Sequence, residues 1–149
     1  MTVRPNDIDI ALVVHVLGAM VLVGGLVTAA SAAVIGWRDE SQTLRRFAAM
    51  TLFAVALPGF LVMRVGAEWV ASKEHLNNLP ETPTWLGIGY GTADAGGLLL
   101  VIALICGGIG ARRARTGGGD TLLKVSGAIA VLLVAVYAVA VWAMGGKPG

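Results

Sequence analysis

Hydrophobic residues dominate four long stretches of this chain, and polar residues gather in the short segments between them. The stretches run from about residue 10 to 37, 47 to 70, 86 to 111 and 122 to 144. A helix needs about 20 mostly apolar residues to cross the hydrocarbon core of a bilayer. Each stretch meets this length, and none alternates apolar and polar residues as the strands of a membrane barrel do. The pattern predicts an all-α, four-helix transmembrane bundle, with residues 1–149 forming one domain.

The composition also indicates a protein that lies mostly in lipid. Of the 149 residues, 56% are hydrophobic and 13% are charged, whereas a soluble domain usually carries about 25% charged residues. A soluble core built by a chain of this length cannot bury so many apolar side chains. The net charge of +2 comes from basic residues scattered between apolar blocks, so we do not expect a nucleic acid partner.

Basic residues are concentrated in two of the three segments between the apolar stretches. Seven Lys and Arg residues lie in or beside these two loops, whereas three lie on the opposite side. The two sets are Arg38, Arg45, Arg46, Arg112, Arg113, Arg115 and Lys124, against Arg4, Lys73 and Lys147. Because such residues accumulate in cytoplasmic loops, we expect these loops inside and both termini outside, in a bacterial cytoplasmic (inner) membrane. The first stretch is longer than the core of a signal peptide, so we expect it to be retained.

Each predicted span places a polar side chain at a similar depth. His15, Arg64, Asp94 and Tyr137 lie about 10 Å below the outer interface at about 1.5 Å per residue, and Glu68 is one helical turn from Arg64. Ionisable groups in lipid are costly unless paired, so they indicate function. We predict a buried polar network of these five residues, with an Arg64–Asp94 pair, Glu68 as a competing partner and His15 within reach. The alternatives are a purely structural salt bridge, or Arg64 and Glu68 reaching the outer surface.

His15 is also a candidate ligand for haem b or copper, because a neutral imidazole nitrogen binds both metals. A b-type haem commonly takes two histidines from facing helices, and the only other histidine, His75, falls in the predicted outer loop. Met63 and Met20 are the nearest sulfur ligands by depth. A haem site would therefore use His15 with Met63, with His75 or with a second subunit. A structural or proton-handling histidine is the alternative.

Small residues recur at helical spacing in the first and third stretches. They are Ala11, Gly18, Gly25, Ala29 and Ala33 in the first, and Gly87, Gly91, Ala93 and Gly97 in the third. Such residues let helices approach closely in lipid, which serves either ordinary bundle packing, a homodimer or the docking of another membrane subunit. Pro58-Gly59 in the second stretch predicts a kink, because proline removes a backbone donor. The kink either bends the helix or opens a polar cavity.

Several short motifs resemble an uncharacterised bacterial family of four-helix integral membrane proteins. They are His15 to Gly18, Val23-Gly24-Gly25, Arg45-Arg46-Phe47, Pro58-Gly59, and Trp85-Leu86 through Tyr90. The first helix of that family is similar to copper-resistance D-type membrane proteins. The resemblance implies a four-helix fold and no particular activity. Leu22 stands where such proteins often have tryptophan, and the further histidines and methionines of a copper path are missing.

Two functions are compatible with these features. No catalytic triad, paired carboxylates for hydrolysis or phosphate-binding loop is recognisable in the chain. We therefore expect a non-catalytic membrane component or accessory subunit, with the lipid bilayer, further copies of itself or other membrane subunits as partners. The alternative is a protein that binds haem or a metal, or handles protons, at the outer polar site around His15.

Overall fold

The computed structural model describes residues 9–76 and 80–146, and these residues contain helices and connecting turns but no strand. The helices are α1 (Ile10–Arg38), α2 (Gln42–Thr51), the π-helix η1 (Leu52–Ala56), α3 (Leu57–Lys73), α4 (Thr84–Ala114) and α5 (Asp120–Gly146). Because α2, η1 and α3 follow one another directly, they form one long span from Gln42 to Lys73. The described chain thus has four helices long and apolar enough to cross a membrane, which confirms the predicted all-α class.

The helices extend a few residues beyond the apolar stretches because polar side chains cap them. The carboxylate of Asp9 accepts hydrogen bonds from the backbone N–H of Ala11, at 3.0 Å, and of Leu12, at 3.5 Å. The hydroxyl of Ser41 accepts one from the N–H of Leu44 at 3.3 Å, where α2 begins. These bonds satisfy donors that have no partner within the first turn of a helix.

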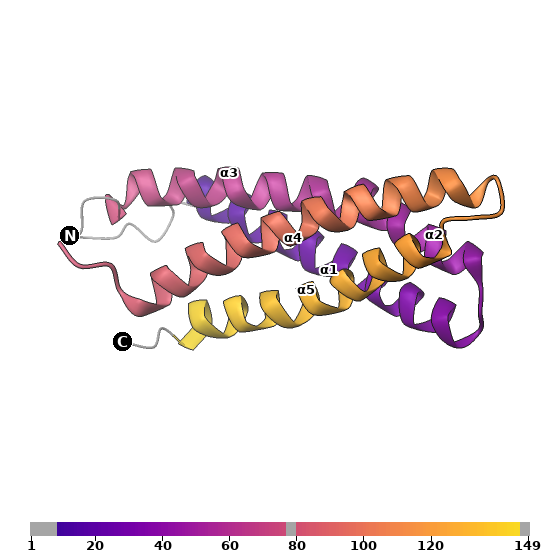
Figure 1. Cartoon of the computed structure of the whole chain (residues 1–149). Coiled ribbons are helices and arrows are strands. Elements are labelled where there is room, and N and C mark those ends of the chain that lie inside the picture. Colours follow the sequence, from indigo (N-terminus) through magenta and orange to yellow (C-terminus); the bar gives the residue numbers. More distant parts are fainter. Residues whose placement is uncertain (1–8, 77–79, 147–149) are drawn as a thin grey trace.

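Helix α1 lies at the centre of the bundle and packs against α2, α3 and α5, while α4 packs mainly against α5. Figure 1 shows that α1 begins and α5 ends at the same end of the bundle, which we call the terminal end. The opposite end, where α2 lies, is called the arginine end. Helix α4 contacts α2 and η1 more extensively than α3. The two hairpins therefore join closely at the arginine end and only sparsely between α3 and α4.

Glycines bring the backbones of α1 and α3 into direct contact. A side chain added at any of four glycines would press on the backbone of the facing helix. The pairs in contact are Gly18 with Met63, Gly25 with Ala56, Gly59 with Leu22, and Gly66 with His15. Close approach of this kind supplies the dispersion contacts that hold helices together in lipid. On α1 the small residues therefore serve bundle packing.

The π-helix η1 ends immediately before Pro58. The N–H of Leu57 donates to the carbonyl oxygen of Leu52, five residues earlier, which is the wide turn of a π-helix. A break in regular α-helix was expected here, because Pro58 has no N–H to donate. Since Gly59 packs on the backbone of Leu22, the expected alternative of a polar cavity at this step is wrong.

Leucines fill the centre of the bundle, and apolar side chains also cover much of its outside. Leu22, Leu26, Leu100 and Leu133 are almost completely buried and belong to one core cluster. Large apolar residues such as Leu17, Val65, Leu98 and Val141 are more than half exposed. In water such a surface would drive aggregation, whereas in a bilayer the lipid tails cover it.

Candidate functional site

An ion pair links α3 to α4 at the level of the predicted polar layer. The Nη2 atom of Arg64 lies 3.1 Å from Oδ1 of Asp94 and 3.4 Å from Oε1 of Glu68. The guanidinium also lies over the ring of Tyr90, 5.5 Å from its centroid, within the range of a cation–π contact. The structure thus confirms both the Arg64–Asp94 pair and the second carboxylate that competes for it. We call Arg64, Glu68, Tyr90 and Asp94 the α3–α4 cluster.

The α3–α4 cluster lies at membrane depth and yet reaches the surface of the bundle. Arg64 is five residues before Trp69, about 7.5 Å along α3, and Asp94 is nine residues after Trp85, about 13 Å along α4. Tryptophan favours the boundary between lipid and water. The exposed fractions of the side chains are 32% for Arg64, 51% for Glu68 and 68% for Asp94. Their carboxylate oxygens therefore face outward at a depth where lipid offers no hydrogen bonds.

The prediction that these charged residues are buried is wrong for Glu68 and Asp94. Helix α4 turns Gly89 and Gly96 toward α5, where they meet the side chains of Met144 and Tyr137. Asp94 is two residues from Gly96, which places it about 200° around the helix from the packed side. Close packing of α4 on α5 therefore sends the carboxylate of Asp94 outward.

His15 contacts the backbone of α3 and does not join the α3–α4 cluster. Its Nδ1 atom lies 3.0 Å from the carbonyl oxygen of Met63, and no other polar contact of its side chain occurs within the described residues. Because a carbonyl only accepts, Nδ1 carries the proton and Nε2 keeps its lone pair. The expectation that His15 lies within reach of the ion pair therefore finds no contact to support it.

Tyr137 is also separate from the ion pair. Its side chain is 4% exposed, and its hydroxyl has no hydrogen-bond partner among the described residues. The ring end packs against Gly96 in α4. The predicted network of five residues thus divides into the α3–α4 cluster, the His15–Met63 contact and an isolated tyrosine. Depth along each helix was predicted well, but the direction of each side chain around its helix was not.

The donor atoms around His15 do not form a complete metal site. Nε2 of His15 is suitable as a ligand, because Nδ1–H donates to a carbonyl as second-shell partners of metal-binding histidines do. Met63 is buried, but its contact with His15 is made by its backbone. The described residues hold no group of three or more His, Cys, Asp or Glu side chains placed to bind a metal. Copper or a haem iron at His15 would need further ligands, such as those of a second chain.

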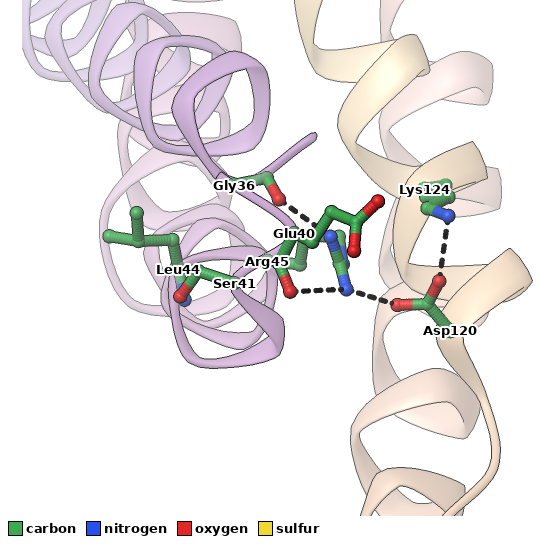
Figure 2. A network of polar contacts seen from close by, with 7 residues as sticks. All are labelled: Gly36, Glu40, Ser41, Leu44, Arg45, Asp120 and Lys124. Atoms are coloured by element: carbon green, nitrogen blue, oxygen red, sulfur yellow. Dashed lines mark hydrogen bonds and ion pairs between the residues drawn. The ribbon is translucent and has the colours of Figure 1, made fainter. Parts of the chain in front are cut away.

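A second polar network lies at the arginine end, centred on Arg45 (Figure 2). Arg45 is only 6% exposed, and its Nη1 donates to the carbonyl of Gly36 at 2.6 Å. Its Nη2 donates to the carbonyl of Glu40 at 3.4 Å and lies 2.6 Å from Oδ1 of Asp120. Lys124 holds the other oxygen of Asp120 at 2.8 Å. We call these residues the Arg45 clamp.

The Arg45 clamp joins the two hairpins and was missed in the sequence. Arg45 extends from α2 to the end of α1 and to the first residue of α5, so one side chain connects three helices. In the sequence it contributes only to the count of basic loop residues. The available signal was Asp120, the acidic residue of the opposite arginine-rich loop, which lies on the same predicted side of the membrane. Its partners bind each other, so the clamp is a structural joint.

Two shallow grooves on the outside of the bundle are apolar. One lies between α1 and α5 beside Ala30 and Val134, and the other lies between α1 and α2 beside Gly24 and Met50. The hydroxyl of Thr28 lines the second groove but donates to the carbonyl of Gly24 at 2.8 Å. Neither groove offers polar groups that converge on a ligand, and both are suited to the acyl chains of lipid.

Comparison with known protein families, curated proteins and solved structures yields no match. The resemblance to a four-helix bacterial membrane family and to copper-resistance D-type proteins therefore stays a prediction from short motifs. The function is argued below from the geometry of the chain.

Proposed function

We propose that this chain is a non-catalytic subunit of a complex in a bacterial cytoplasmic membrane. The observation that supports the proposal is the α3–α4 cluster, whose carboxylates are half or more exposed at membrane depth. A charged side chain within the membrane normally faces protein or a water-filled cavity and is paired there. Another protein seated on this face would cover Glu68 and Asp94 and remove that cost.

The proposal includes an orientation with both arginine loops in the cytoplasm. The turn after α1 and the turn after α4 lie together at the arginine end (Figure 1), and they carry most of the basic residues of the chain. The positive-inside tendency places this end in the cytoplasm. The α3–α4 cluster then lies in the outer leaflet, and the ends of α1 and α5 at the terminal end face outward.

The subunit proposal is tested by crosslinking in the native membrane. A photoreactive residue at Leu98, which is 64% exposed on α4, should give an adduct with one defined membrane protein. The same residue at Leu132, which is 50% exposed on α5, is the matched control and should react with lipid only. Identical adducts at both positions, or lipid adducts alone at Leu98, would show that the α3–α4 face is not an interface.

A haem- or metal-binding role is the second candidate, and the tautomer of His15 is the observation that favours it. The hydrogen bond from Nδ1 to Met63 leaves Nε2 able to ligate. Oxidised and reduced absorption spectra and metal analysis of protein purified in mild detergent test this role. A Soret band or bound copper that His15→Ala abolishes would support it, and a colourless, metal-free protein would leave the subunit proposal alone.

A further inference from the structure

One face of α4 is exposed in the half of the helix that carries Asp94. Gly87, Gly91, Asp94 and Leu98 follow one another at intervals of three or four residues, and all four are exposed. At 3.6 residues per turn this spacing places them along one side of the helix. Ala95, also exposed, flanks the same side. We call these five residues the α4 outer face.

The glycines of the α4 outer face have no role within the chain. A side chain added at Gly87 or Gly91 would meet no atom within 4 Å, whereas one at Gly89 or Gly96 of the same helix would overlap α5. Glycine disfavours a helix relative to alanine, and in the packed glycines close helix contact offsets that cost. Gly87 and Gly91 lack such a contact inside the chain, and they leave the backbone of α4 open to a neighbour.

The charge beside these glycines is unbalanced. Arg64 supplies one positive charge to two carboxylates, Glu68 and Asp94, so the α3–α4 cluster carries one excess negative charge. Lys73, the next basic residue of α3, pairs with Asp9 and does not neutralise it. Asp94 is the most exposed member and belongs to both the cluster and the α4 outer face. A neighbour on this face therefore meets an acidic group that still lacks a counter-charge.

We propose that the α4 outer face binds a membrane-spanning helix of a different protein, and that this helix carries one lysine or arginine in its outer-leaflet third. The basic side chain pairs with Asp94, while the partner backbone approaches α4 over Gly87 and Gly91. Small residues that permit close approach, together with a polar contact, are the usual means of helix association in lipid. This inference rests on the proposed role as a subunit and specifies the partner.

A second copy of this chain is a poorer occupant of the face. A twofold contact through Gly91 would bring two equivalent Asp94 residues together, because an isologous interface repeats each residue on both sides. Two such pairs would contain two guanidinium groups and four carboxylates. Repulsion of like charges in a medium of low dielectric opposes that assembly.

The test uses a synthetic helix in liposomes. A fluorescent leucine–alanine peptide of about 23 residues carries one lysine about eight residues from one end, and energy transfer from labelled full-length protein reports association. The lysine peptide should associate about tenfold more tightly than peptides with leucine or glutamate at that position. Equal association of all three peptides would overturn the proposal, and so would self-association of the protein that the peptide cannot displace.

Two pairs of variants locate the binding. D94N removes the acidic group while Arg64 keeps Glu68, so the fold is retained, and it should reduce the preference for lysine to about that of the leucine peptide. G91L should block the approach of the peptide, whereas G24L, at another glycine with open space around it, should leave binding unchanged. Loss of binding in G24L as well as G91L would contradict the assigned face.

The outcomes separate this inference from the proposal on which it rests. Crosslinking at Leu98 to a membrane protein whose spans contain no basic residue would retain the subunit role and overturn the partner chemistry. Binding of the lysine peptide without any crosslinked protein in the native membrane would retain the chemistry of the face and overturn the subunit role.

Discussion

The guanidinium of Arg64 in α3 reaches the carboxylate of Asp94 in α4, at 3.1 Å, in a region where these two helices otherwise make few contacts. Phe60, one turn away on α3, packs its ring against Gly97 of α4. These two side chains bridge α3 to α4 along the part of the bundle that the Arg45 clamp does not hold. The ion pair is therefore a hinge point between the hairpins as well as a part of the exposed site.

Loss of Arg64 should destabilise the protein more than loss of Asp94. R64M leaves two carboxylates without a counter-charge, whereas in D94N the guanidinium keeps Glu68 at 3.4 Å. A double-mutant cycle by reversible unfolding in mixed micelles should give a coupling energy of about 0.5–1.5 kcal/mol between the two residues. Additive effects, or a larger loss of stability in D94N than in R64M, would contradict the role given to Glu68.

The glycine contacts between α1 and α3 should tolerate no side chain. A Cβ at Gly18 would overlap the backbone of Met63, so G18A forces the two helices apart. We expect it to lower the free energy of unfolding by about 1–3 kcal/mol, the usual effect of overpacking. G24A, in the same helix but with open space around it, is the control and should be neutral or stabilising. Equal stability of both variants in micelle unfolding would argue against this packing.

The Arg45 clamp should be the most sensitive polar feature of the fold. R45A leaves the carbonyl of Gly36 without its donor and breaks the buried pair with Asp120, and removal of one partner of a buried pair typically costs about 3–5 kcal/mol. R45K should lose less, because one ammonium keeps the charge but serves fewer acceptors. Arg46 is the control: it has the same charge in the same loop but no polar contact among the described residues, so R46A should change stability little.

Stability at the terminal end should depend on acid pH through Asp9. The hydrogen bond from Lys73 holds the pKa of the Asp9 carboxyl below its usual value of 3.8. A lowered pKa in the folded state means that the contribution is complete above about pH 3.8 and is lost as the pH falls through the folded value. Amide exchange at the start of α1 should therefore accelerate in that range, and D9N should remove this dependence. An unchanged acid profile in D9N would assign the effect to another group.

The proposed orientation is tested with single cysteines in a C106A background. T116C lies in the turn between α4 and α5 and E81C lies in the segment before α4. In intact cells a membrane-impermeant maleimide should label E81C and leave T116C unlabelled until the membrane is opened. The reverse pattern would place the α3–α4 cluster in the inner leaflet.

Sequence patterns predicted the parts of this structure that depend on length and depth. The number of spans follows from apolar runs of more than 20 residues, and the Arg64–Asp94 pair follows from equal depth in neighbouring helices. Rotation about each helix axis is set by packing, such as the contact of Gly96 with Tyr137, which no local pattern encodes. For this reason Asp94 was expected inside and lies outside.

Backbone partners were also invisible in the sequence. The carbonyl of Met63 that accepts from His15, and the carbonyl of Gly36 that accepts from Arg45, belong to residues whose side chains gave no polar signal. An arginine beside a loop is usually read as a determinant of orientation, and only the tertiary structure shows that Arg45 is buried. The same limit applies to Gly66, whose importance depends on the helix that faces it.

The π-helix at Leu52–Ala56 sets the angular phase of everything that follows it in the second span. A π-turn holds one residue more than the α-turn it replaces, so deleting one residue there would restore a uniform α-helix without shortening the apolar stretch noticeably. Every later side chain would then rotate by about 100° about the helix axis, which would carry Arg64 away from Asp94 and Gly66 away from His15. The wide turn thus acts as a register element, and a length change of one residue at this point matters more than most substitutions elsewhere in the span.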